Sequence, residues 1–114
     1  MIYNSITVRY LESITFDDCL SKYPYAQRVI VGKSTHQIIF GKQDNNYCFA
    51  VAGSPYLLAM TKWVKNVLEK KEFFSLQECT INDLFRLFDF PFQKRKDAFL
   101  ILNLISNLNV FENF

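Results

Sequence analysis

The stretch that decides the fold spans residues 49–68 and reads FAVAGSPYLLAMTKWVKNVL. An apolar strand comes first, stops at Gly53 and turns into a helix. Glycine supplies backbone freedom at the corner, and Ser54 can accept a hydrogen bond from a free amide of the first helical turn. Pro55 suits the next position, because the N–H that proline lacks would be unpaired there anyway. We therefore predict a strand, a corner and a helix that runs to about Lys71.

This helix needs an apolar surface to lie on. Apolar side chains recur along it at intervals of three and four residues, the spacing of one helical face: Leu57, Met60, Val64 and Val67. Trp63 lies at the edge of this stripe, where we expect its ring to pack on the core rather than to anchor a partner. The preceding strand indicates that the supporting surface is a sheet.

The segments before Gly53 favour strands. β-branched and aromatic side chains dominate residues 28–31, 37–40 and 47–52, and turn-forming residues fill positions 41–46. The first two segments are either two strands or one strand with a break. Residues 6–10 alternate apolar and polar side chains and predict a further, half-buried strand.

Helices dominate the rest of the prediction. Thr15 and Asp18 form a capping pattern that opens a short helix, which Pro24 must end. Further cap patterns at residues 75–78 and 80–83 precede a short amphipathic helix that Pro91 interrupts, and a last helix begins near Lys94. Strands followed by helices predict an α+β fold. We expect residues 1–114 to form one domain, in which a small antiparallel sheet of three or four strands is followed by three helices packed on one face.

The composition limits the class of protein. Half of the 114 residues are apolar and 17% are aromatic, so the chain can bury a core. No apolar run is long enough to cross a bilayer, and the first residues lack the pattern of a signal peptide. The three cysteines are far apart, which favours free thiols, and a net charge of +2 argues against nucleic acid as a partner. We expect a cytoplasmic protein that binds neither membranes nor nucleic acid.

Two chemical motifs are incomplete. Residues 32–35, Gly-Lys-Ser-Thr, are similar to the end of a phosphate-binding loop, but the full pattern needs a glycine where Gln27 stands and a helix where a strand is predicted. His36 is the only histidine, and no two cysteines have the close spacing of zinc ligands. We therefore predict no metal site, no cofactor and no catalytic residue.

Positive charge gathers at two places. Lys62 and Lys65 lie on the polar side of the central helix, and Lys94, Arg95 and Lys96 begin the last helix. Positive charge is mildly unfavourable at the start of a helix because of the helix dipole. These three side chains are therefore either a solvated surface cluster or the binding site of an acidic partner.

Three short stretches resemble one known superfamily. Residues 53–59, Gly-Ser-Pro-Tyr-Leu-Leu-Ala, match a Gly-Cys-x-x-x-x-Ala motif, with Ser54 at the cysteine. Residues 90–97, Phe-Pro-Phe-Gln-Lys-Arg-Lys-Asp, resemble a Leu-Pro run into a basic helix start, with Asp97 at a second cysteine, and residues 95–99 are similar to Arg-x-Asn-Gly-Leu. Residues 34–39, Ser-Thr-His-Gln-Ile-Ile, resemble Cys-Gln-Ser-Gln-Val-Trp. These motifs are those of the SufE/NifU superfamily, the sulfur acceptors and IscU-type scaffolds of iron–sulfur cluster assembly.

The resemblance implies the fold of that superfamily without its usual chemistry. A thiolate is both the sulfur nucleophile and the soft ligand for iron, and a serine hydroxyl at neutral pH is neither. The resemblance therefore implies a non-catalytic relative that binds a protein partner, such as a cysteine desulfurase. The residues that it assigns to the binding surface are Ser34, Ser54, Lys94, Arg95, Lys96 and Asp97.

Two alternatives stay open at this point. The first is a sulfur carrier that uses Cys19, Cys48 or Cys79 in place of the family cysteines, which requires an exposed thiol with a lowered pKa. Buried cysteines are more often small hydrophobic residues than nucleophiles. The second alternative is an unrelated small α+β domain that binds other proteins.

Overall fold

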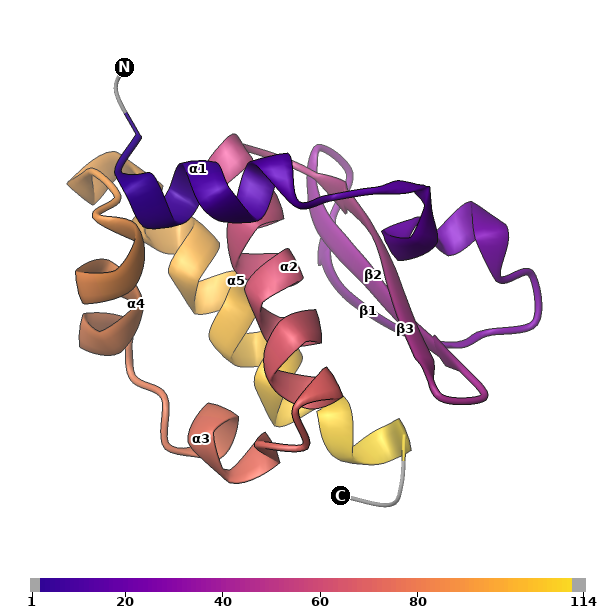
Figure 1. The fold of residues 1–114 in the computed structure, drawn as a ribbon. Coiled ribbons are helices and arrows are strands. Elements are labelled where there is room, and N and C mark those ends of the chain that lie inside the picture. Colours follow the sequence, from indigo (N-terminus) through magenta and orange to yellow (C-terminus); the bar gives the residue numbers. More distant parts are fainter. Residues whose placement is uncertain (1–2, 112–114) are drawn as a thin grey trace.

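The structure, a computed structural model, describes residues 3–111. Within these residues it contains one three-stranded sheet, five α-helices and short 3-10 turns (Figure 1). The fold is α+β, as predicted. The predicted order is wrong at its start, since helix α1 (Ser5–Glu12) precedes the sheet, and four α-helices rather than three follow the strands in the described part of the chain.

The sheet is antiparallel, with the strands β1 (Gln27–Lys33), β2 (His36–Gln43) and β3 (Asn46–Ala52) in the order β1-β2-β3. Lys33 pairs with His36, so two strands joined by a tight turn are present where the sequence also allowed one broken strand. The second turn is shorter than the predicted residues 41–46. Pairing continues to the end of β2 and the start of β3, because Asp44 adopts the positive φ of 56° that a two-residue turn requires.

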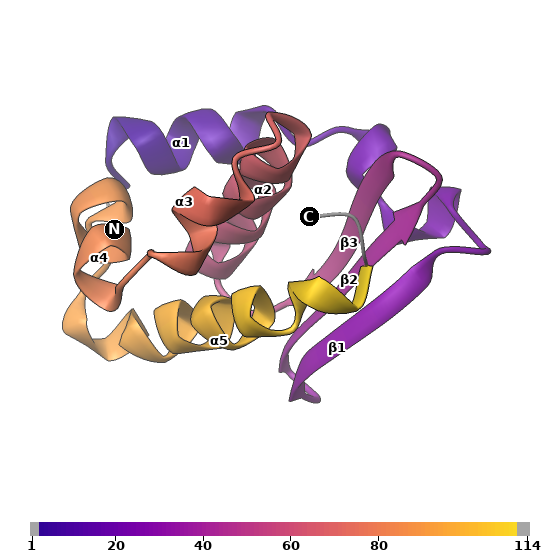
Figure 2. The same ribbon diagram turned by 90° about the horizontal axis from the view of Figure 1, so that it is seen from below.

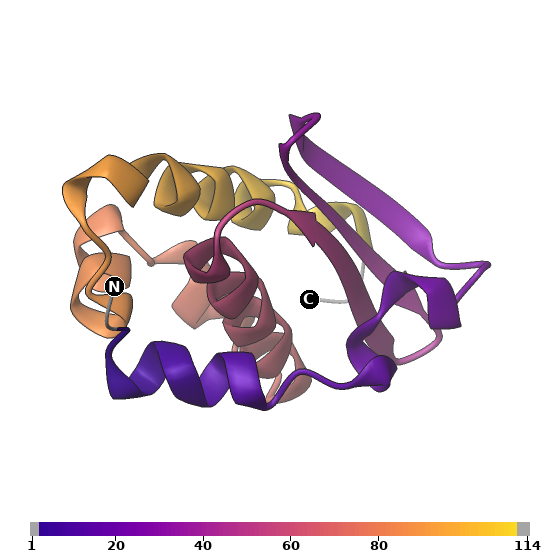
Figure 3. The ribbon, with the colours of Figure 1, turned by 90° about the horizontal axis from the view of Figure 1, so that it is seen from above.

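One face of the sheet carries the apolar core. Strand alternation places four buried side chains on this face: Val31, Ile38, Phe40 and Phe49. Helices α2 (Pro55–Glu69) and α5 (Arg95–Ser106) pack against it. In the views from below and from above, α1 and α5 lie on opposite sides of α2, and α4 joins them at the end away from the sheet (Figures 2 and 3).

Residues 6–10 form helix α1, so the prediction of a strand there is wrong. The side chain of Asn4 accepts a hydrogen bond from the backbone N–H of Thr7 at 2.9 Å and caps the first turn. Ile6 and Tyr10, one helical turn apart, pack on the core. A spacing of four residues fits both a helix and a strand, and a segment of five residues is too short to separate the two periods.

The capping pattern at Thr15 is present but opens only a 3-10 turn. The backbone N–H of Thr15 donates to Asp18 Oδ2 at 2.9 Å, and two turns follow, η1 (Phe16–Asp18) and η2 (Leu20–Lys22). Between them, Cys19 forms an isolated bridge with Phe49 of β3. This bridge places the segment at the free edge of β3, and neither turn continues into a regular helix.

The corner at Gly53 forms as predicted. Ser54 is the N-cap of α2 and accepts a hydrogen bond from the N–H of Leu57 at 3.3 Å, and Pro55 is the first helical residue. Gly53 has a φ of +155°, which residues with a side chain rarely adopt, and a Cβ there would lie 2.8 Å from the Leu57 side chain. The backbone therefore makes this turn only with glycine at the corner.

Two short helices connect α2 to α5. Ser75 lies inside α3 (Phe73–Gln77), so the predicted cap at residues 75–78 is wrong. The cap at Thr80 begins α4 (Ile81–Phe88): Thr80 Oγ1 accepts from the N–H of Asp83 at 3.2 Å, and the N–H of Thr80 donates to the Asp83 carboxylate at 2.9 Å.

Trp63 is partly buried and packs against the core, as predicted. Its ring lies edge-on to Phe88 of α4, with the ring centroids 6.1 Å apart. The contact ties α2 to α4 away from the sheet. Among residues 3–111, no helix has both the length and the apolar character that a membrane crossing demands.

Candidate functional site

Three polar side chains from distant parts of the sequence meet beside the corner at Gly53. The carboxylate of Asp97 contacts His36 Nε2 with one oxygen and accepts a hydrogen bond from Ser54 Oγ with the other. The first contact spans 61 residues of sequence and the second spans 43. We refer to His36, Ser54 and Asp97 as the Asp97 cluster.

Local structure explains why these residues meet. His36 is the first residue of β2, and the next residue, Gln37, pairs with Ala52 at the end of β3, which brings His36 beside the corner. A Cβ on Gly53 would lie 3.6 Å from His36 Cδ2. Asp97 lies in the first turn of α5, which packs across β1 and β2. The pairing of the sheet and the position of α5 therefore build the cluster.

The Asp97 cluster is buried at its centre and open at its rim. Asp97 is 1% exposed, whereas the side chain of His36 is 28% exposed. A buried carboxylate is stable only with hydrogen-bond donors around it, and Ser54 and His36 supply them. Because a carboxylate only accepts hydrogen bonds, the Nε2 atom of His36 is the protonated ring nitrogen in this contact.

A hollow of about 380 Å³ opens over the cluster, and we refer to it as the polar hollow. Thr35, Lys94 and Lys96 complete its lining beside the cluster and Gly53. Neither lysine forms an ion pair with a carboxylate of residues 3–111. The polar hollow therefore presents a positively charged rim around a buried negative group.

The residues that the sequence assigned to a binding surface divide into two groups. Ser54, Lys94, Lys96 and Asp97 all line the polar hollow. Ser34 and Arg95 do not.

Ser34 and Arg95 point elsewhere for local reasons. Ser34 lies exposed in the β1–β2 turn, where its φ is 52°. Arg95 faces the other side of α5, where its guanidinium group lies 3.8 Å from the centre of the Phe92 ring. His36, which the sequence did not assign to the binding surface, contacts Asp97 in the cluster instead. The sequence signal that could have assigned His36 to the site is its position in residues 34–39, one of the three stretches that resemble the superfamily.

The Asp97 cluster does not have the order of a catalytic triad. In a Ser-His-Asp triad the histidine lies between the other two residues and removes the proton of the serine. Here Asp97 lies between Ser54 and His36, and the serine hydroxyl donates a hydrogen bond to the carboxylate. The arrangement fixes the corner and gives no activated nucleophile.

The donor atoms of the Asp97 cluster also do not fit an iron–sulfur cluster. Such clusters are held mainly by cysteine thiolates, and this site offers one imidazole, one carboxylate and one hydroxyl. Within residues 3–111 no three His, Cys, Asp or Glu side chains gather in a way that would hold a metal ion. The residues present therefore do not support the chemistry of the scaffolds that the motifs resemble.

None of the three cysteines lines the polar hollow. Cys48 is fully buried, and burial raises the pKa of its thiol. Burial and the nearby Asp83 raise the pKa of Cys79 to about 11. Cys19 is half-buried, and its thiol donates to the carbonyl oxygen of Thr15 at 3.8 Å. Raised pKa values keep thiols protonated at neutral pH, which argues against Cys48 and Cys79 as sulfur nucleophiles.

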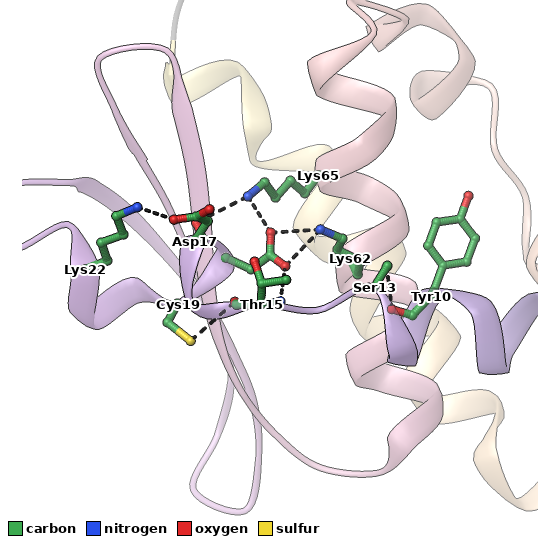
Figure 4. A network of polar contacts seen from close by, with 9 residues as sticks. Tyr10, Ser13, Thr15, Asp17, Cys19, Lys22, Lys62 and Lys65 are labelled. Carbon is green, nitrogen blue, oxygen red and sulfur yellow. Dashed lines mark hydrogen bonds and ion pairs between the residues drawn. The ribbon is translucent and has the colours of Figure 1, made fainter.

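A second polar cluster joins α2 to the segment before the sheet (Figure 4). Lys62 Nζ donates to the two Asp18 oxygens at 2.9 and 2.8 Å, and Lys65 Nζ donates to the same carboxylate. All three residues are less than 10% exposed, so the prediction that both lysines lie on the polar side of the helix is wrong. Burial alone would raise the pKa of Asp18, but hydrogen bonds from the two lysines outweigh it and hold the pKa below its usual range. We interpret this cluster as structural.

Comparison with known proteins leaves the function to be argued from this geometry. No family model, no curated protein and no solved structure matches the chain.

Proposed function

We propose that this protein is a non-catalytic relative of the SufE/NifU group that binds a protein partner in iron–sulfur cluster assembly, with a cysteine desulfurase as the first candidate. The docking surface is the polar hollow together with the basic start of α5. One observation carries the proposal: each of the three stretches that resemble the superfamily contributes one residue to the Asp97 cluster. Three chance resemblances would have no reason to meet at one place in the fold.

The non-catalytic part follows from the chemistry of the residues that replace cysteine. The hydroxyl of Ser54 donates a hydrogen bond to the buried carboxylate of Asp97, so it stabilises the corner. Asp97 is buried and contacted on both oxygens. Neither side chain can accept a sulfur atom in the way a thiolate does.

The binding part rests on charge. Lys94 and Lys96 project at the rim of the polar hollow without an ion pair to any carboxylate of residues 3–111. Complementary charge on a partner increases the rate of association and makes binding sensitive to salt. We therefore expect an acidic surface on the partner and weaker binding at high ionic strength.

The first test is size-exclusion co-elution with the cysteine desulfurase of the same organism under reducing conditions. We expect the wild-type protein to co-elute and the double variant Lys94→Glu with Lys96→Glu to elute separately. The matched control is Lys70→Glu with Lys71→Glu, which changes the same charge at the far end of α2, where both residues are exposed. Separate elution of the wild-type protein would refute desulfurase binding and leave an unrelated α+β domain as the better interpretation.

A second test addresses catalysis alone. Purified protein is incubated with ferrous iron, sulfide and a thiol reductant, desalted and examined for visible absorption. We expect no chromophore to remain on the protein. A stable absorption band that survives desalting would contradict the non-catalytic part of the proposal without affecting the binding part.

A further inference from the structure

A second hollow lies on the other side of the α5 start, and we refer to it as the aromatic groove. It encloses about 680 Å³, within the roughly 300–1,000 Å³ typical of ligand sites. Tyr56 and Phe90 form its buried floor, at 2% and 3% exposure. Phe85 and Phe92 stand at its sides, at 49% and 68% exposure. Two large aromatic rings thus face solvent across one apolar depression.

The end of α4 explains why these rings are uncovered. The helix stops at Phe88, Asp89 takes a left-handed conformation, and Pro91 prevents the helix from continuing. Phe90 turns inward and packs edge-on to Phe85, with the ring centroids 5.4 Å apart. Phe92 is left outside the core. Exposed apolar surface gathered in one depression is typical of a binding site.

The start of α5 carries positive charge that forms no ion pair within residues 3–111, and Arg95 brings part of this charge to the groove. Arg95 lines the groove and stacks on Phe92, whereas its sequence neighbours Lys94 and Lys96 line the polar hollow. None of the three forms an ion pair with a carboxylate of residues 3–111. The acidic residue of the same helical turn, Asp97, points inward to His36 and Ser54 and leaves these charges uncompensated at its surface.

We propose that the aromatic groove binds a linear segment of a partner protein in which apolar side chains are flanked by aspartate or glutamate. The apolar side chains enter between Phe85 and Phe92, and a carboxylate pairs with the guanidinium group of Arg95. Binding would neutralise the charge of Arg95, a cation that lies at the unfavourable end of a helix dipole. This inference concerns a surface outside the polar hollow, and it shares only Arg95 with the docking surface of the desulfurase proposal.

The chemistry of the groove favours a peptide over single-stranded RNA. Exposed aromatic rings next to arginine suit both ligands. However, the floor is apolar, and the carboxylate of Asp89 belongs to the lining, where it would repel a phosphate backbone. A protein segment can place acidic side chains on the Arg95 side only and leave Asp89 to accept from a backbone N–H.

The experiment selects a random peptide library displayed on phage against the immobilised wild-type protein, with counter-selection on the double variant Phe92→Ser and Arg95→Glu. Both side chains are exposed, and circular dichroism and thermal unfolding verify that the variant is folded. We expect the enriched peptides to share apolar residues next to Asp or Glu. No enrichment, or enrichment of basic or uncharged polar peptides, would overturn the proposal.

Fluorescence anisotropy with the most enriched peptide then assigns the site. We expect Arg95→Glu and Phe92→Ser each to weaken binding about tenfold or more, as for anchors of a small interface. The controls Lys70→Glu and Phe74→Ser, also at exposed positions, should bind as the wild type does. Equal effects of test and control variants would refute the site, and tighter binding of an oligouridine RNA would favour a nucleic-acid groove instead.

The same variants separate the two proposals. Phe92→Ser should lose the peptide and still co-elute with the desulfurase, because Phe92 lies outside the polar hollow. Loss of both activities in Phe92→Ser would mean that the two hollows form one surface and would overturn the separate groove.

Discussion

Gly53 determines both the corner of the fold and the position of the Asp97 cluster. Its φ of +155° turns the chain from β3 into α2, and the space where a Cβ would lie is bordered by Leu57 and His36. Ser54 follows directly and reaches Asp97. A side chain at this one position therefore disturbs the backbone, the first turn of the helix and the cluster together.

We predict that Gly53→Val destabilises the protein by more than about 2 kcal/mol, because a β-branched residue fits a positive φ badly. Urea denaturation followed by circular dichroism measures the change. Ala50→Val is the matched control, since Ala50 is exposed in β3, the strand that leads to Gly53, and has ordinary strand pairing; we expect a change within about 0.5 kcal/mol. A midpoint for Gly53→Val as close to wild type as the control would refute the role of the corner.

Within residues 3–111, Asp18 is the one carboxylate that forms ion pairs with the buried Lys62 and Lys65. Asp18→Asn leaves the ammonium groups of Lys62 and Lys65 buried without a counter-charge, and we expect a loss of about 3–5 kcal/mol. The control Asp17→Asn removes an exposed carboxylate that forms its ion pair with Lys22 on the surface, and it should change little. Similar urea midpoints for the two variants would show that the buried cluster is not a major source of stability.

The same residue predicts a pH dependence. The folded-state pKa of Asp18 is lowered, so its contribution is complete above the unfolded-state value of about 3.9 and is lost as the pH falls through the folded-state value. The difference in unfolding free energy between the wild type and Asp18→Asn should therefore shrink at acid pH. A series of urea titrations below pH 5 measures this difference. A gap that stays constant with pH would mean that Asp18 is not ionised in the folded protein.

The sequence predicted the β3–corner–α2 unit correctly and helix α1 wrongly, because only the first has strong local signals. The β3–corner–α2 unit has local signals that agree, namely a glycine with positive φ, an N-cap serine and a proline at the first helical position. Helix α1 has a weaker signal, because its cap residue Asn4 is reinforced by a distant contact, a hydrogen bond from its side-chain amide to the carbonyl oxygen of Leu87 at 2.9 Å. No window of sequence contains that contact.

The two capping patterns predicted between α2 and α5 have different outcomes in the structure. Thr80 and Ser75 both begin a capping pattern in the sequence, but only Thr80 caps a helix in the structure. We predict that Thr80→Ala destabilises the protein by about 1 kcal/mol and that Ser75→Ala does not, since alanine is a better helix former than serine inside a helix. Thermal or urea unfolding measures both. A larger loss for Ser75→Ala would contradict the observed start of α4.

Across the whole molecule, the candidate site depends on packing that local sequence does not specify. Ser54 and Asp97 were assigned to a binding surface from motifs, but the contact of Asp97 with His36 arises only when α5 packs across the sheet. The burial of Lys62 and Lys65 likewise needs the turn at Asp18 to lie against α2. The sequence therefore did not predict the buried charged residues that pair over long range. A charged residue is expected at the surface unless its buried partner is known.

The whole fold also bears on the sulfur-carrier alternative, because burial lowers the reactivity of Cys48 and Cys79. We predict that iodoacetamide at neutral pH leaves Cys48 and Cys79 unmodified in the folded protein and modifies all three cysteines in urea. The reason is burial, which raises the pKa of Cys48 and, together with Asp83, that of Cys79 to about 11. Mass spectrometry of the intact protein and its peptides measures the modification, with Cys79→Ser as the control for assignment. Rapid alkylation of Cys48 or Cys79 in the native state would contradict this prediction, and the sulfur-carrier alternative fails only if Cys19 is inert as well, since a sulfur nucleophile must be an exposed thiolate.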